Sequence, residues 1–150
     1  MRTALLLIAV ALAGCVKYPE PYRPPIQRRP MELTGSNKLT LFAPTDAAFE
    51  ALQRKLGVAT PAPAITCSLP QATVFNILAY HVTDGRRFSN SVFNKRSTKM
   101  IEMLNGQYIV TNPNLSINDN AGKTISPVLP RVNINASNGV IHVIDGVLEP

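Results

Sequence analysis

The chain has 150 residues, two cysteines and a formal net charge of +6 at neutral pH. This charge is too small and too scattered for a nucleic-acid-binding protein, in which basic residues form a dense patch or stripe. Two cysteines also exclude a small secreted scaffold held by disulfides, which carries an even and dense set of them. The fold must therefore depend on an apolar core, to which four phenylalanines can contribute: Phe42, Phe49, Phe75 and Phe93.

The first fifteen residues, MRTALLLIAVALAGC, have the order of a secretory signal: a short positive start, an apolar run and small residues. The apolar run is much shorter than the roughly 20 residues that a membrane-spanning helix needs. The end of this segment, Leu12-Ala13-Gly14-Cys15, resembles the bacterial lipobox, in which the cysteine sulfur receives a diacylglyceryl group. The alternative is ordinary secretory cleavage after Ala11-Leu12-Ala13, which would leave Cys15 as a free thiol. We expect residues 1–14 to be a lipoprotein signal peptide and Cys15 to be acylated.

Residues 15–30 follow as a proline-rich spacer, with five prolines after the cysteine. Proline fixes φ and removes an amide donor, so this stretch favours a semi-rigid extended conformation of about 3 Å per residue. Such a spacer would lift a domain off the membrane. Val16, rather than aspartate, follows Cys15, which favours the outer membrane if the cell has two.

We expect the folded part of the chain to begin near Lys38. The β-prone run 39–42 stops at Pro44, and Thr45 can cap a helix whose apolar face is Phe49, Leu52 and Leu56 and whose end is Gly57. A capping box over residues 68–71 predicts a second helix. The apolar face of this helix is Val74, Phe75, Leu78 and Val82, and the helix is predicted to end by Asp84-Gly85.

The remainder of the chain is predicted to be β structure. Asn105-Gly106 would turn a hairpin between residues 100–104 and 107–111, and weaker strands at 115–117 and 124–128 flank a turn. Residues 132–134 and 140–144 flank a turn carrying Asn138-Gly139. Helices in the first half and strands in the second, without βαβ alternation, predict an α+β fold.

Three stretches together resemble a fasciclin-type domain, an extracellular adhesion module. They are Thr40-Leu41-Phe42-Ala43-Pro44-Thr45-Asp46-Ala47-Ala48-Phe49, then Ile77-Leu78-Ala79-Tyr80-His81-Val82 with Gly85, and finally residues 135–145 (NASNGVIHVID) with Val147-Leu148. Their order and spacing match the family over about residues 33–150, and we place the domain at 31–150. The resemblance implies a β-sheet wedge flanked by helices. It also exposes a departure, because the spacer occupies the place of the family's usual leading helical segment.

The resemblance also links Tyr80 and His81 to adhesion, although the family's matching histidine is mainly a structural hydrogen-bonding residue. At the end of a helix, a protonated His81 would also interact favourably with the helix dipole. His142 shares a strand face with Val140 and Ile144, which favours a core histidine over a ligand. No cluster of ligands with metal-binding spacing is visible, so no metal or cofactor is expected. A thiol dyad of Cys67 with either histidine is the enzymatic alternative.

The sequence therefore predicts a non-catalytic envelope lipoprotein that presents an adhesion or protein-interaction domain. Its expected partners are the membrane, through the lipid, and an unidentified envelope or extracellular protein or polysaccharide, with no role for nucleic acid. The alternative is a binding module for a glycan or a small hydrophobic ligand, which would need an apolar pocket with a few polar groups.

Overall fold

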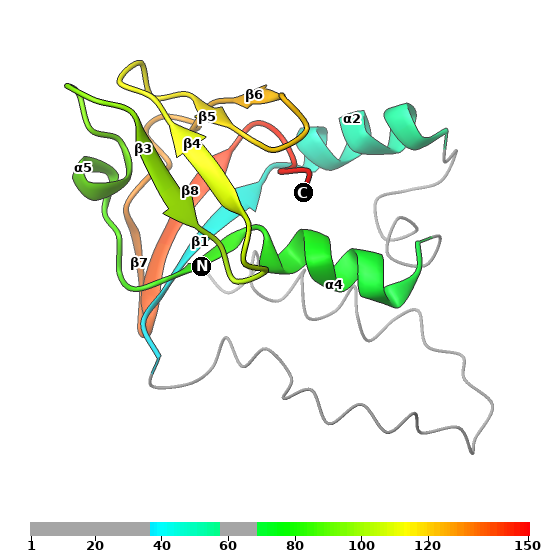
Figure 1. The fold of residues 1–150 in the computed structure, drawn as a ribbon, viewed down its shortest axis with the longest axis horizontal. Helices are drawn as coiled ribbons and strands as arrows, with labels where there is room; N and C mark the ends of the chain where they lie inside the picture. The colour runs from blue at the N-terminus through cyan, green and yellow to red at the C-terminus, as the bar shows by residue number, and fades with distance from the viewer. Residues whose placement is uncertain (1–36, 58–68) are drawn as a thin grey trace.

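The computed structural model describes residues 37–57 and 69–150. Their strands form two four-stranded sheets (Figure 1). The first has the order β2-β1-β8-β7, with bounds Val82–Asp84, Leu39–Pro44, Gly139–Ile144 and Ile134–Ala136. The second has the order β3-β4-β5-β6, with bounds Lys99–Glu102, Tyr108–Thr111, Ile117–Asn118 and Thr124–Ile125. The helices are α2 (Asp46–Leu56), α4 (Gln71–Ala79) and the single turn α5 (Ser89–Val92). This is the α+β fold that the sequence predicts.

The two sheets are joined by hydrogen bonds along both sides. On one side β2 meets the end of β3, where the Leu104 N–H donates to the Val82 carbonyl over 2.8 Å. On the other side the chain after β6 runs beside the end of β8. There the Val128 N–H donates to the Val143 carbonyl, and the Asp145 N–H donates to the Ser126 carbonyl. The strands therefore enclose the space between the sheets instead of leaving it open at an edge.

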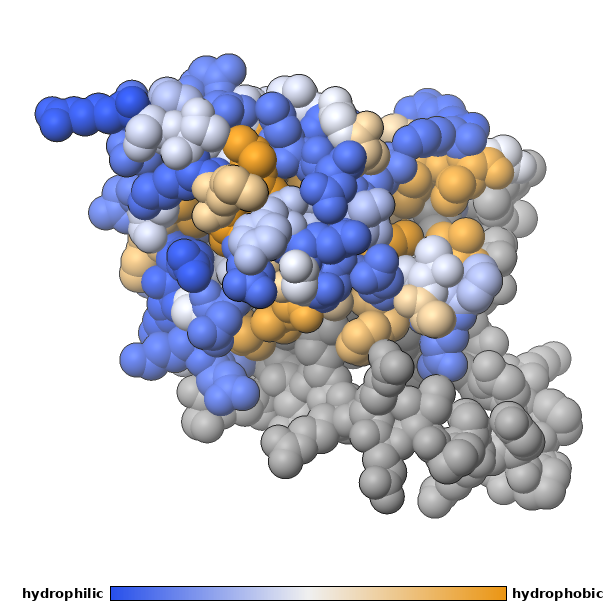
Figure 2. All heavy atoms as spheres, viewed as in Figure 1, coloured by the Kyte–Doolittle hydropathy of each residue, from blue (hydrophilic) through white to orange (hydrophobic). Residues whose placement is uncertain are grey.

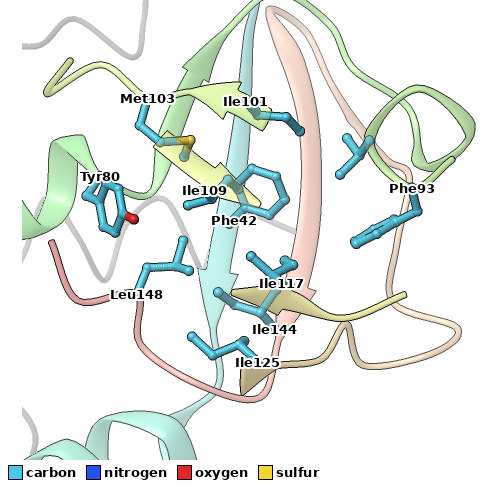
Figure 3. Packing of buried hydrophobic residues seen from close by; sticks show 11 residues of the cluster. Phe42, Tyr80, Phe93, Ile101, Met103, Ile109, Ile117, Ile125, Ile144 and Leu148 are labelled. Atoms are coloured by element: carbon cyan, nitrogen blue, oxygen red, sulfur yellow. The ribbon is translucent and has the colours of Figure 1, made fainter. Parts of the chain in front are cut away.

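The main core fills that enclosed space (Figure 3). Phe42 from β1 and Ile144 from β8 face Ile109 and Ile117 from the other sheet, and all four are fully buried. Of the phenylalanines considered for the core, Phe42 and Phe93 lie in this cluster, and Phe49 packs in a smaller cluster with Leu52 and Val147. Phe75 is 42% exposed, so it is not part of the described core.

The predicted strand–turn–helix unit is present. The Thr45 hydroxyl accepts a hydrogen bond from the Ala48 N–H over 3.3 Å, and Gly57 closes α2 in the left-handed conformation with φ of 67°. Both ends of the helix therefore follow the local capping rules. The predicted apolar face is only partly right, because Leu52 is buried whereas Leu56 is 44% exposed.

The second helix is shorter than predicted. It begins at Gln71, and Pro70, its N-cap, provides no side-chain cap. Ser68 of the predicted capping box lies outside the described residues, so that interaction is not tested. The helix ends at Ala79, and Val82 belongs to strand β2, where it pairs with Leu41. Pairing with β1 therefore overrides the helical spacing that placed Val82 on the helix.

The predicted hairpins are present, with one correction. Gly106, with φ of 82°, lies in the turn between β3 and β4, as predicted. Asn138-Gly139 is not the centre of its turn, because Gly139 is the first residue of β8 and pairs with Ala136. A Cβ at Gly139 would collide with the Leu39 carbonyl oxygen of the parallel neighbour β1. Glycine is therefore required by close strand approach rather than by a turn.

Candidate functional site

Tyr80 is the C-cap residue that follows α4, and its side chain enters the main core. The ring is fully buried, and its hydroxyl donates to the Tyr108 carbonyl at 2.8 Å and accepts from the Asn120 N–H at 3.1 Å. Burial raises the pKa of the Tyr80 hydroxyl, which keeps it protonated and able to donate. Tyr80 therefore joins α4 to the start of β4 and to the turn between β5 and β6.

His81 follows and is also buried, with 4% of its surface exposed. Its Nδ1 lies 2.7 Å from the Ile77 carbonyl, and its Nε2 accepts from the Leu148 N–H at 2.9 Å. Because Nε2 is an acceptor, the proton of the neutral ring lies on Nδ1 and is donated to Ile77. Burial lowers the pKa of His81 to about 4, so the ring is neutral at pH 7 and does not provide the cationic helix end considered from the sequence.

Asp119 belongs to the same arrangement and lies in the turn between the predicted strands at 115–117 and 124–128. One carboxylate oxygen accepts from the Lys123 N–H at 2.8 Å, and the other accepts from the Glu149 N–H at 3.0 Å. It therefore holds both the turn and the segment that follows β8. Tyr80, His81 and Asp119 together fasten two segments, the turn at residues 119–123 and residues 147–149, of which Val147 and Leu148 are fully buried. The available sequence signal was an acidic residue opening a turn that ends in glycine.

His142 lies at a separate place, on the inner face of β8. It is fully buried and stacks on Phe42 with ring centroids 5.7 Å apart, and its Nε2 lies 2.8 Å from the Arg87 carbonyl. Its Nδ1 faces the Asn133 N–H at 3.4 Å, a long hydrogen bond. Burial lowers the pKa of His142. It is the hydrogen-bonded core histidine that the strand pattern predicts.

The two histidines do not form one site, since each uses its ring nitrogens on a different part of the backbone. Among residues 37–57 and 69–150, no group of three or more acidic, histidine or cysteine side chains is placed to hold a metal ion. Within the same part of the chain no helix is long and apolar enough to cross a membrane. Cys15 and Cys67 both lie outside the described residues, so the predicted acylation and the proposed thiol dyad are not tested.

Strands closed around one core, with buried Tyr80 and His81 fastening its loops, define a module of the FAS1 fold. The model is similar to the FAS1 domain pair of the insect cell adhesion molecule fasciclin I, with a TM-score of 0.51 and 14% identity. That match covers 74% of this chain and 36% of the other, and at this identity it establishes the fold alone.

The fasciclin domain model matches residues 29–150, and the chain belongs to this family. Its domains are often adhesion modules and are generally non-catalytic. Protein sll1483 from Synechocystis sp. is 31% identical over 121 residues, which are 79% of this chain and 58% of that protein. The chain thus spans somewhat more than half the length of that relative.

Proposed function

We propose that this protein is a non-catalytic cell-envelope lipoprotein, anchored through Cys15, whose fasciclin domain mediates adhesion to an envelope or extracellular protein or polysaccharide. Membership of the fasciclin family carries the proposal. The lipobox-like sequence and the proline-rich spacer support the anchor. Both histidines are neutral and hydrogen-bonded to backbone, so neither is free to serve as a general base, which supports a binding role.

In this proposal Tyr80 and His81 act indirectly, through the backbone that they hold by hydrogen bonds. Their own side chains are buried, so a partner would instead meet the residues whose backbone they hold. One such residue is Tyr108, which is 43% exposed on the outer face of the hairpin formed by β3 and β4. Met100, on the same face, is 69% exposed. Figure 2 shows apolar side chains among hydrophilic ones on the face of the molecule that carries this hairpin.

The anchor is tested by membrane fractionation and intact-protein mass spectrometry of wild type and Cys15→Ser. Wild type should be retained with membranes and carry the mass of an acylated N-terminal cysteine, whereas Cys15→Ser should be released. A wild-type protein cleaved after Ala13, without added lipid, would overturn the anchor.

Adhesion is tested by coating beads with the protein and measuring their binding to purified envelope fractions. Beads carrying an unrelated globular protein of similar charge are the reference. Met100→Glu places a charge on the exposed hairpin face and should reduce binding, whereas Leu129→Glu, at another site that is 62% exposed, should not. Binding no stronger than that of the reference beads would overturn the adhesion proposal.

A further inference from the structure

Three carboxamide side chains meet where the tip of the hairpin formed by β3 and β4 approaches α4. Asn105 lies in the hairpin turn, Gln107 directly precedes β4, and Asn76 lies on α4. Asn105 Nδ2 donates to Asn76 Oδ1 and to Gln107 Oε1, each at 3.1 Å. Figure 2 shows hydrophilic and apolar side chains side by side where, in Figure 1, the hairpin tip meets α4. Asn76, Asn105 and Gln107 together form the amide cluster.

The backbone fixes the orientation of the amide cluster. The Gln107 backbone N–H can only donate, and it donates to Asn105 Oδ1 at 3.1 Å, so Asn105 Nδ2 is the donor toward the other two side chains. Asn76 and Gln107 therefore accept with their side-chain oxygens, and their NH₂ groups are left over. Within the described part of the chain neither NH₂ group has an acceptor. Asn76 is exposed and Gln107 is half-buried, so both groups can be reached from solvent.

The surroundings of the amide cluster restrict the charge of a ligand. Residues 69–83 and 103–118 contain no Lys, Arg, Asp or Glu, although the whole chain has a net charge of +6. The charged residues that border these stretches are Asp84, Glu102 and Asp119, all of them acidic. A polyanion would be repelled by these carboxylates. A cation would gain nothing from NH₂ groups, which only donate. The amide cluster therefore suits an uncharged ligand that is rich in hydrogen-bond acceptors.

A sugar matches a surface that only donates better than a peptide does. A hydroxyl group can rotate its hydrogen away and accept, so each sugar oxygen adapts to a donor. A peptide brings one backbone N–H with almost every carbonyl, and an N–H that faces the amide cluster would lose its hydrogen bond to water without replacing it. A two-fold contact between two copies of the cluster is disfavoured for the same reason, because donors would face donors.

Exposed apolar side chains border the amide cluster. Phe75 precedes Asn76 on α4 and is 42% exposed, and Leu104 precedes Asn105 in the turn and is 43% exposed. Methyl groups would gain from contact with such side chains. An acetamido group supplies both a carbonyl oxygen for the donors and a methyl group for the apolar border. A sugar ring that carries this group is therefore favoured over a ring with hydroxyl groups alone.

We propose that the amide cluster binds an uncharged N-acetylated glycan. Asn76 and Gln107 donate to the acetamido carbonyl and to neighbouring hydroxyl oxygens. The inference rests on the adhesion proposal, for which it names the class of polysaccharide partner. The amide cluster includes neither Met100 nor Tyr108 of the hairpin face. Beads that adhere to envelope fractions while the soluble glycan does not bind would therefore overturn the glycan site and leave the adhesion proposal standing.

The test is a titration of the ¹⁵N-labelled full chain with N,N′,N″-triacetylchitotriose, followed by NMR. The side-chain NH₂ signals of Asn76 and Gln107 should shift and saturate, with a dissociation constant on the order of 1 mM for a small exposed site. Cellotriose, which has hydroxyl groups in place of the acetamido groups, should bind at least about five-fold more weakly. Equal binding of the two sugars, or no saturation by about 20 mM, would overturn the proposal.

An isosteric variant reverses the direction of the hydrogen bonds. Asn105→Asp keeps the acceptor for the Gln107 N–H, and Asp-Gly suits a hairpin turn as Asn-Gly does. Its carboxylate only accepts, so Asn76 and Gln107 must turn their NH₂ groups toward it and present oxygens to the ligand. Binding should fall at least about ten-fold, whereas Asn90→Asp, the same change at an exposed asparagine on α5, should alter it less than about two-fold. Equal losses in the two variants would contradict the site.

A second pair of variants removes one donor group. Gln107→Ala should weaken binding about five-fold, whereas Gln71→Ala, at an exposed glutamine where α4 begins, should change it less than about two-fold. Gln107→Ala binding as tightly as wild type would contradict a role for its NH₂ group. Tighter binding of N-acetyl-trialanine amide than of triacetylchitotriose would overturn the glycan assignment.

Discussion

Acidification is expected to destabilise the domain through His81. In the folded protein the pKa of His81 is lowered to about 4 by burial, against 6.5 for an exposed histidine. Between these values the unfolded chain binds a proton that the folded protein does not, so stability falls as pH falls. The contribution of His81 to stability is complete above about pH 6.5 and is lost as the pH falls to about 4. At about 1.4 kcal/mol per pKa unit, the loss through His81 alone is about 3 kcal/mol.

Urea unfolding, followed by far-ultraviolet circular dichroism at several pH values between 7.5 and 4, measures this loss. His81→Gln is the control, because glutamine does not titrate and still offers an acceptor to the Leu148 N–H. The variant should be about 1 kcal/mol less stable at pH 7.5, since the hydrogen bond to the Ile77 carbonyl is lost. Its stability should then depend less on pH, so that it equals or exceeds wild type near pH 4.

The comparison isolates His81 because all other titrating groups, including His142 with its lowered pKa, are common to both proteins. Parallel pH profiles for wild type and His81→Gln would refute the reasoning. So would a His81 pKa near 6.5 in a histidine NMR titration of the folded protein.

Three further substitutions test the fold by the same urea measurement. Tyr80→Phe should lower the free energy of unfolding by about 1–3 kcal/mol, because it leaves buried backbone groups unpaired. Tyr108→Phe, at an exposed ring, should lower it by less than about 0.5 kcal/mol. Similar losses in the two variants would contradict the role of the Tyr80 hydroxyl. Gly139→Ala should destabilise the protein more than Gly106→Ala, because only at Gly139 does the added methyl meet the β1 backbone. Gly106→Ala should cost about 1 kcal/mol of stability through its positive φ alone. The reverse order would refute the close approach of β1 to Gly139. Thr45→Ala should cost about 1 kcal/mol through the lost cap, and an unchanged midpoint would show that the cap contributes nothing.

Features set by neighbouring residues could be predicted from the sequence. Thr45 and Gly57 mark the ends of α2. The Thr45 hydroxyl accepts a hydrogen bond from an N–H of the first turn, and Gly57 adopts the left-handed conformation that ends the helix. Asn105-Gly106 marks its hairpin for the same reason. The alternation of Val140, His142 and Ile144 placed the histidine on the inner face correctly.

Features set by distant contacts could not be predicted from the sequence in this way. The helix spacing continues to Val82, but the backbone there pairs with β1 instead. Asn138-Gly139 is a turn signal, yet Gly139 is needed because β1, a strand far away in sequence, packs directly against its backbone. The candidate site was likewise predictable only in part. The family resemblance indicated Tyr80 and His81, but their acceptors and the role of Asp119 depend on the three-dimensional fold.

The pairing of β1 with β8 sets when the domain can fold. The parallel register joins Leu39 to Gly139, the first described strand to the last, across 100 residues of chain. Contacts so far apart in sequence form slowly, because the intervening chain must first give up its freedom. A chain that emerges from a ribosome or an export channel in order cannot complete this sheet until β8 has emerged. The topology therefore delays completion of this sheet until β8 is available, which would suit the unfolded passage through a membrane that the proposed lipid anchor requires.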